Sequence, residues 1–226
     1  MVKLSSAFYS RISKIGLKKR WNQEHAKVRI INKISPEKAA IHAYLCGDGH
    51  IGSRTDNRGY PHHDIRIWPD NEELAHFIIS LFKKEYNIEP KIRNLGEYFR
   101  VEIASKPAFH NLIKIGDSGT SNWKIPTNLT KNAKIEWIKA FFDCESNVDI
   151  RGKRIALKSV NFDGLLQMKD ALSSFKIDSK VYGPYQPKNL KHSPYGILAI
   201  MKNNICIYRK LINFNHPAKR EKLNRL

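Results

Sequence analysis

The sequence AIHAYLCGDGHI, residues 40–51, decides the fold, because the similar sequence WIKAFFDCESNV returns at residues 137–148. Each copy reads as an apolar helix that ends in one acid, Asp48 in the first copy and Glu145 in the second. The spacing of 145 − 48 = 97 residues is too long for a solenoid repeat and about right for two copies of a small domain. The sequence therefore predicts a fused internal duplicate.

Small residues lie four positions apart in each copy, Ala43 and Gly47 in the first and Ala140 and Cys144 in the second. Residues at this spacing share one face of a helix, and small side chains there let two helix backbones approach closely. If the two helices pack through these faces, the two acids meet at helix C-terminal ends, where like charges repel. A bound cation would relieve this repulsion. Hard oxygen ligands, completed by backbone carbonyls and water, favour Mg²⁺ over zinc.

The two segments together resemble the paired dodecapeptide motifs of the LAGLIDADG homing endonucleases, in the single-chain form with two motifs. The sequence CGDG, residues 46–49, matches the end of the first motif. The chain departs from the family at Ala43 and Ala140, where glycine is usual, at Cys46, and at Ser146, where a second glycine is usual. None of these departures removes a metal ligand.

The order of patterns along the chain predicts helix, two strands, helix, two strands and helix in each copy. In the first copy, Ser35 caps a helix that begins at Pro36, a hairpin follows to residue 68, and a helix runs from Pro69 to near Asn87. Strands at 91–93 and 98–103 and a helix at 106–115 complete it.

The expected fold class is α+β, with two pseudo-symmetric αββαββα repeats. The resemblance implies that each repeat forms a four-stranded antiparallel sheet, a saddle with helices on one face, and that the motif helices pack together. The expected domains are a basic N-terminal extension at 1–35, a first repeat at 36–115, a linker at 116–130 and a second repeat at 131–226.

The extension carries a helix-like pattern from Ser6 to Ile15, followed by the basic cluster Lys18–Arg20. It could be a DNA-binding arm, a small helical module or a solvated basic tail.

The net charge of +19, from 40 Lys and Arg against 21 Asp and Glu, favours a polyanionic partner such as nucleic acid. Apolar runs are too short for a membrane span and no signal segment is seen, so no membrane partner and a cytoplasmic location are expected.

Three cysteines, Cys46, Cys144 and Cys206, have no paired spacing. They indicate neither a disulfide framework nor zinc, and we expect each to be a buried structural thiol.

Alternation along the strands predicts a basic open face on each sheet, from which acids are mostly missing. The candidate DNA-binding residues are Arg54, Arg66, Lys91, Arg93 and Arg100 in the first copy and Arg151, Arg154, Lys158, Lys180 and Tyr182 in the second. An ordinary solvated sheet face is the alternative. Because a two-stranded ribbon fits the major groove, where Arg and Lys bind guanine edges and phosphates, double-stranded DNA is the favoured partner.

Phosphodiester hydrolysis needs an activated water and a cation at the leaving oxygen, and Asp48 and Glu145 are the candidate catalytic metal ligands. Alternatively, Asp48 is only a turn residue and Glu145 only a charge at a helix end. The resemblance implies Mg²⁺ or Mn²⁺ as cofactor, with the backbone carbonyls of Gly47 and Cys144 as further ligands.

The resemblance also implies one basic catalytic residue per copy beyond the fourth strand, for which Lys124 and Lys219 are the candidates, with a plain surface lysine as the alternative. The sequence Trp68-Pro69-Asp70 stands where relatives often have a polar Gln-Lys pair, which would affect the cleavage rate.

The resemblance implies a site-specific, intron-encoded DNA endonuclease that cuts both strands and acts as a monomer with internal pseudo-two-fold symmetry. The alternatives are a splicing maturase that binds intron RNA and a DNA-binding protein of the same fold whose catalysis has decayed.

Overall fold

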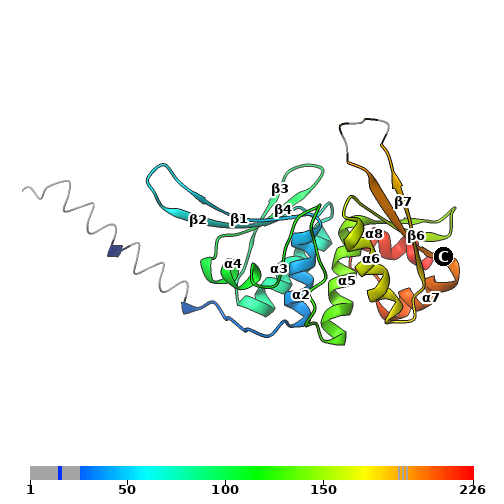
Figure 1. Ribbon diagram of the computed structural model, residues 1–226. Coiled ribbons are helices and arrows are strands. Elements are labelled where there is room, and N and C mark those ends of the chain that lie inside the picture. The colour runs from blue at the N-terminus through cyan, green and yellow to red at the C-terminus, as the bar shows by residue number, and fades with distance from the viewer. Residues whose placement is uncertain (1–14, 17–25, 188, 190, 192) are drawn as a thin grey trace, which may run out of the picture.

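The computed structural model describes residues 15–16, 26–187, 189, 191 and 193–226 (Figure 1). The basic cluster Lys18–Arg20 lies outside the described residues, as does the helix predicted from Ser6, except for its last residue, Ile15. Within the described part of the chain, every helix is too short or too polar to cross a membrane.

The first repeat has the predicted order of elements. They are α2 (Pro36–Cys46), β1 (Gly49–Thr55), β2 (Pro61–Ile67), α3 (Glu72–Tyr86), β3 (Lys91–Asn94), β4 (Phe99–Ile103) and α4 (Lys106–Leu112). Helix α4 is shorter than predicted, because the chain leaves the helix at Ile113 and continues as turns.

The second repeat has the same order and then adds one helix. Its elements are α5 (Lys131–Glu145), β5 (Ser146–Asp149), β6 (Arg154–Ser159), α6 (Phe162–Ser173), β7 (Ser179–Tyr185), β8 (Tyr195–Met201), α7 (Lys202–Leu211) and α8 (Pro217–Asn224). Helix α8 is an addition to the predicted order.

Each repeat forms one four-stranded antiparallel sheet, ordered β1-β2-β4-β3 in the first repeat and β5-β6-β8-β7 in the second. Figure 1 shows both sheets on the same side of the molecule, with the helices beneath them and α2 beside α5 in the middle. The α+β fold of two αββαββα repeats is therefore confirmed.

Local sequence explains where α2 begins and ends. The Ser35 hydroxyl accepts a hydrogen bond from the backbone N–H of Lys38 at 3.0 Å, and Pro36 occupies the first turn, where its missing N–H costs nothing. At the other end, a Cβ added to Gly49 would lie 2.5 Å from the Leu45 Cα, so only glycine fits where the chain turns into β1. Ser146 needs no such glycine, because α5 passes into β5 with extended backbone.

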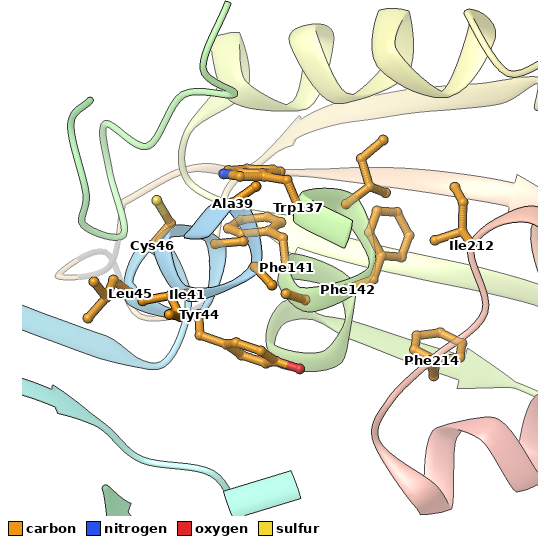
Figure 2. Packing of buried hydrophobic residues seen from close by; sticks show 14 of the residues in the cluster. Ala39, Ile41, Tyr44, Leu45, Cys46, Trp137, Phe141, Phe142, Ile212 and Phe214 are labelled. Carbon is orange, nitrogen blue, oxygen red and sulfur yellow. The ribbon is translucent and has the colours of Figure 1, made fainter. Parts of the chain in front are cut away.

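Helices α2 and α5 pack directly against each other and form the centre of the core. Ala43 and Ala140 are fully buried in this helix pair, as the small-residue pattern predicts. Figure 2 shows Phe141 of α5 beside α2 and the Tyr44 ring extending towards α5, whereas Ile41 and Leu45 lie on the opposite side of α2.

Candidate active site

Asp48 and Glu145 come together where α2 and α5 end. Gly47 follows α2, and a Cβ added to it would lie 2.5 Å from the Cys144 Cβ and 3.5 Å from the Glu145 Oε1. The Cys144 thiol donates a hydrogen bond to the Asp48 side chain. The backbone carbonyl of Asp48 also accepts from the Trp68 N–H at 2.9 Å, which fixes Asp48 to the end of β2.

The surroundings of both acids disfavour their charged forms. Burial, followed by the Asp48 charge, raises the pKa of Glu145 from 4.5 to about 7, and Lys219 opposes this shift. Asp48 keeps an exposed edge, yet partial desolvation by the packed helix ends raises its pKa above its usual value. Two carboxylates therefore repel each other in a partly dehydrated site, as the sequence predicts.

Lys219 of α8 lies at the same helix end. Its ammonium donates to the backbone carbonyls of Phe142 at 3.4 Å and Cys144 at 3.2 Å, and also to that of Asp143. The Phe142 carbonyl also accepts from the backbone N–H and the hydroxyl of Ser146. All three carbonyls lie in the last turn of α5, at the negative end of the helix dipole, where a cation is favourable. Burial lowers the pKa of Lys219, while the acids around it act in the opposite direction.

Lys124, the other candidate, is not brought to the acids in this way. It is exposed, and its ammonium has no hydrogen bond or ion pair with the residues that the structure describes. Its neighbour Trp123 is buried against the second repeat, where the Asn161 amide donates to the Trp123 carbonyl at 2.6 Å.

The sequence WKIP at residues 123–126 is similar to FNHP at residues 214–217, and this match explains the difference between the two lysines. The offset of 214 − 123 = 91 residues pairs Lys124 with Asn215, and it pairs Lys219 with Asn128. The two lysines are therefore not equivalent positions of the duplication.

A buried carboxylate that the sequence analysis missed holds α8 in place. Asp143 accepts hydrogen bonds from the Tyr44 hydroxyl at 2.7 Å and from the backbone N–H groups of Asn215 and His216, both at 3.0 Å. The signal was available, since Asp143 is an acid within the otherwise apolar run that leads to Glu145.

Asp70 and His216 form a second contact that the sequence did not indicate. His216 caps α8, and its Nδ1 accepts from the Lys219 backbone N–H at 3.5 Å. Its Nε2 therefore carries the proton and donates to the Asp70 Oδ1 at 2.9 Å. This bond joins α8 to the first repeat and places a third carboxylate near Asp48.

The candidate DNA-binding residues lie on the open sheet faces, except for Arg151, which lies in the turn between β5 and β6. The expectation that acids are mostly missing from these faces is wrong. The ion pairs are Arg54–Asp64, Arg66–Asp64, Arg66–Glu102, Arg93–Glu102, Arg100–Glu102 and Arg154–Asp149. The same alternation that exposes the arginines exposes these acids, because Arg66 stands directly opposite Glu102 in the β2–β4 register.

The other five candidates differ in what they contact. Lys91, Arg151 and Lys180 are exposed and form no ion pair with the described residues, and Tyr182 is 40% exposed. Lys158 places its ammonium 3.8 Å from the centre of the Tyr195 ring.

The expectation of three buried thiols is met in full only by Cys46, since Cys144 is partly buried and Cys206 is exposed. Cys46 is buried, and the surroundings of Cys144 raise its pKa well above the usual value through burial, but Cys206 is exposed. Helix α7 turns Ile205 and Tyr208 into the core, and Cys206 lies on its other face.

The donor set at the helix ends fits a hard divalent ion. No group of three or more His, Cys, Asp or Glu side chains among the described residues is arranged to hold a metal. The two carboxylates, with the Gly47 and Cys144 carbonyls beside them, offer oxygen donors of the kind that Mg²⁺ and Mn²⁺ prefer. The Cys144 carbonyl is hydrogen-bonded to Lys219, so an ion using this oxygen would compete with the lysine.

Comparison with known proteins identifies the fold. Residues 132–213 match the family model of the LAGLIDADG-like domain. The crystal structure of I-DmoI in complex with DNA and Mn is similar with a TM-score of 0.62 and 16% identity, over 80% of this chain and 97% of that one. The homing endonuclease I-WcaI bound to its DNA recognition sequence is similar with a TM-score of 0.57 and 15% identity, over 92% of both chains.

One curated relative matches at the level of sequence. It is the probable translation initiation factor IF-2 of Methanocaldococcus jannaschii, 28% identical over 170 residues. The match includes 71% of this chain but only 14% of the length of that protein. The resemblance of the motif pair to the LAGLIDADG family is confirmed by the domain match and the shared two-repeat fold.

Proposed function

We propose that this chain, which has the two-repeat LAGLIDADG fold, is a site-specific endonuclease that cuts both strands of duplex DNA with divalent metal ions. One observation carries the proposal: Asp48 and Glu145 meet at the ends of α2 and α5 with raised pKa values. A fold that needed only stability would gain by neutralising these acids, so the retained repulsion indicates a site that binds cations.

The residues of the chain have distinct tasks in this proposal. The open sheet faces hold the duplex through phosphate and base contacts, and they present it to the acids. A divalent ion, when bound, activates water near neutral pH and stabilises the charge of the leaving oxygen. Asp48, Glu145 and the Gly47 and Cys144 carbonyls would hold such ions.

Lys219 adds a positive charge beside the acids. Because its ammonium reaches the carbonyls at the end of α5, it partly neutralises the metal-free site. If a bound ion displaced the Lys219 ammonium from these carbonyls, the ammonium could stabilise the negative charge that develops on a phosphate during hydrolysis.

A second candidate is a DNA-binding protein of the same fold that has lost cleavage. The observation that favours it is Asp70, which adds a third carboxylate where relatives often have polar residues, and which is 68% exposed towards solvent. A further negative charge beside a scissile phosphate would slow hydrolysis.

The experiment is cleavage of a duplex library spanning candidate intron insertion sites, with Mg²⁺, with Mn²⁺ and with EDTA. We expect double-strand cuts at one sequence in the presence of either metal and none with EDTA. Specific binding without cleavage would instead favour the decayed protein. Binding to structured intron RNA in preference to duplex DNA would favour the maturase.

A further inference from the structure

The two sheets present different chemistry at equivalent positions of their open faces. In the first sheet, Arg66 of β2 and Arg100 of β4 both contact Glu102, at 3.3 Å and 3.8 Å. The registers Arg66↔Glu102 and Ala156↔Ala199 show that these positions correspond between the sheets. Along β4 and β8, the 97-residue offset pairs Arg100 with Ile197.

A cluster of three interlocked charges in the first sheet is thus replaced by small and apolar residues in the second. Ala156 and Ile197 are partly exposed and Met201 is 40% exposed, while Ala199 between them is fully covered. We call Ala156, Ile197 and Met201 the apolar strip. It lies on β6 and β8, the two central strands of the sheet.

Three basic residues border the apolar strip, together with the uncharged Tyr182 beside Ile197 and Asn147 beside Ala156. Lys180 stands beside Ala199, and Arg154 stands beside Met201 in the strand register. Lys158 stands beside Ile197. The strip therefore lies within a basic rim, which suits the bases of a groove with phosphates on either side.

From this replacement of charged by apolar residues we infer that the two sheets bind the two halves of the DNA site, the half-sites, with different base preferences. The second sheet recognises thymine-rich steps through their methyl groups. In the major groove, Arg makes paired hydrogen bonds to guanine, whereas apolar side chains contact the C5 methyl of thymine. The first sheet accordingly prefers guanine at its central positions. This inference rests on the proposed binding of duplex DNA and concerns its sequence.

The test first selects tight-binding duplexes from a library randomised in both half-sites, with Ca²⁺ present. Uracil, which lacks only the C5 methyl group, then replaces thymine in one half-site at a time. We expect roughly fourfold weaker binding for each contacted thymine, the equivalent of one buried methyl group. The loss should occur in one half-site only, opposite a half-site rich in guanine.

The variant Ile197→Gln assigns the sensitive half-site to the second sheet. It should abolish the effect of uracil there, because the apolar contact is already lost. The matched control is Ile207→Gln, the same change at a residue 36% exposed on α7, which contacts β6 and β8 from the helix side. This variant should keep the full effect of uracil.

Three outcomes are distinguishable. Sensitivity to uracil in one half-site, abolished by Ile197→Gln, supports the inference. Sequence-specific binding that uracil weakens in neither half-site overturns it and leaves the proposed function standing. Absence of specific duplex binding overturns the proposed function, and the inference with it.

Discussion

Residue 46 of α2 and residue 143 of α5 are equivalent positions of the duplication, yet their side chains differ in chemistry and in the segments they contact. Cys46 is a buried thiol whose sulfur lies 3.7 Å from the Asp117 carbonyl oxygen. Asp143 is a buried carboxylate that binds the chain just before α8. The 97-residue offset also pairs Tyr44, whose hydroxyl donates to Asp143, with Phe141, which has no hydroxyl.

This difference shows how one half of a duplicated site acquires a lysine. Asp143 fixes the first turn of α8, and α8 then places Lys219 at the end of α5. A thiol at the equivalent position cannot bind two backbone N–H groups in this way. The chain after α4 instead forms turns, and Asn128 stands at the position equivalent to Lys219. The duplication preserved the backbone while the charges of its two halves diverged.

The largest expected effect comes from removing the lysine that only one half has. Lys219→Met should lower the rate of cleavage by about a hundredfold, because a positive charge near the scissile phosphates is lost. Single-turnover cleavage with each strand labelled separately measures this. Duplex affinity should change much less.

Lys124→Met is the matched control for this comparison, since Lys124 is exposed and away from the helix ends. It should stay within about threefold of the parent, as expected for a single phosphate contact at most. Equal losses for both variants would mean that the two halves are equivalent and that α8 has no special role.

The second prediction concerns the repulsion between the acids in metal-free protein. Because the pKa of Glu145 is about 7 in the folded protein and 4.5 ordinarily, the folded state binds this proton more tightly than the unfolded chain. The stability that results is fully present below pH 4.5 and is lost as the pH rises through about 7. Glu145→Gln should therefore raise the free energy of unfolding at pH 8 by on the order of 2 kcal/mol.

Urea unfolding in EDTA at pH 4 and pH 8 checks this sign. The two proteins should be equally stable at the lower pH. Glu97→Gln, a change of the same kind at an exposed acid, should be neutral within about 0.5 kcal/mol at both. A Gln variant that is less stable than the parent at pH 8 would show that Glu145 is a structural acid.

A smaller effect is expected from the hydrogen bond that crosses the helix pair in one half only. Tyr44→Phe makes this position resemble Phe141, and it removes a bond to a buried carboxylate, at a cost of about 1.5 kcal/mol. Tyr86→Phe is the comparison, because the equally buried Tyr86 hydroxyl donates to a neutral amide, Asn111, at 3.0 Å. It should cost about 1 kcal/mol. Thermal or urea melts distinguish the two variants. If Tyr44→Phe left the stability unchanged, the backbone N–H groups alone would be sufficient to stabilise Asp143, which contradicts the prediction.

Much of the fold could be predicted because its signals are local or repeated. Ser35 and Pro36 mark the start of α2, and the alternation in β2 and β4 sets their covered faces. The two motifs, repeated at a fixed offset, predict the helix pair and its two acids. The long-range contact among them, the packing of α2 on α5, is indicated by the small residues that both motifs carry on one helix face.

The features that the sequence did not reveal depend on contacts between distant segments. The bond between Asp70 and His216 joins residues 146 positions apart, and no periodic pattern predicts it. The ion pairs of Glu102 depend on the strand register, which alternation alone does not determine. The resemblance indicates Lys219 as a candidate, but the hydrogen bonds of Asp143 that fix the position of Lys219 are evident only in the fold.

The most direct test of the shared acid pair is strand-resolved cleavage by Asp48→Asn and Glu145→Gln, beside duplex affinity and the melting temperature without metal. Each change keeps the shape of the side chain and removes one charge that would hold a divalent ion. We expect cleavage to fall by roughly a thousandfold in each variant, with duplex affinity retained and the metal-free protein at least as stable as the parent. A variant that cuts both strands like the parent, or one that loses activity only because it unfolds, would contradict the account.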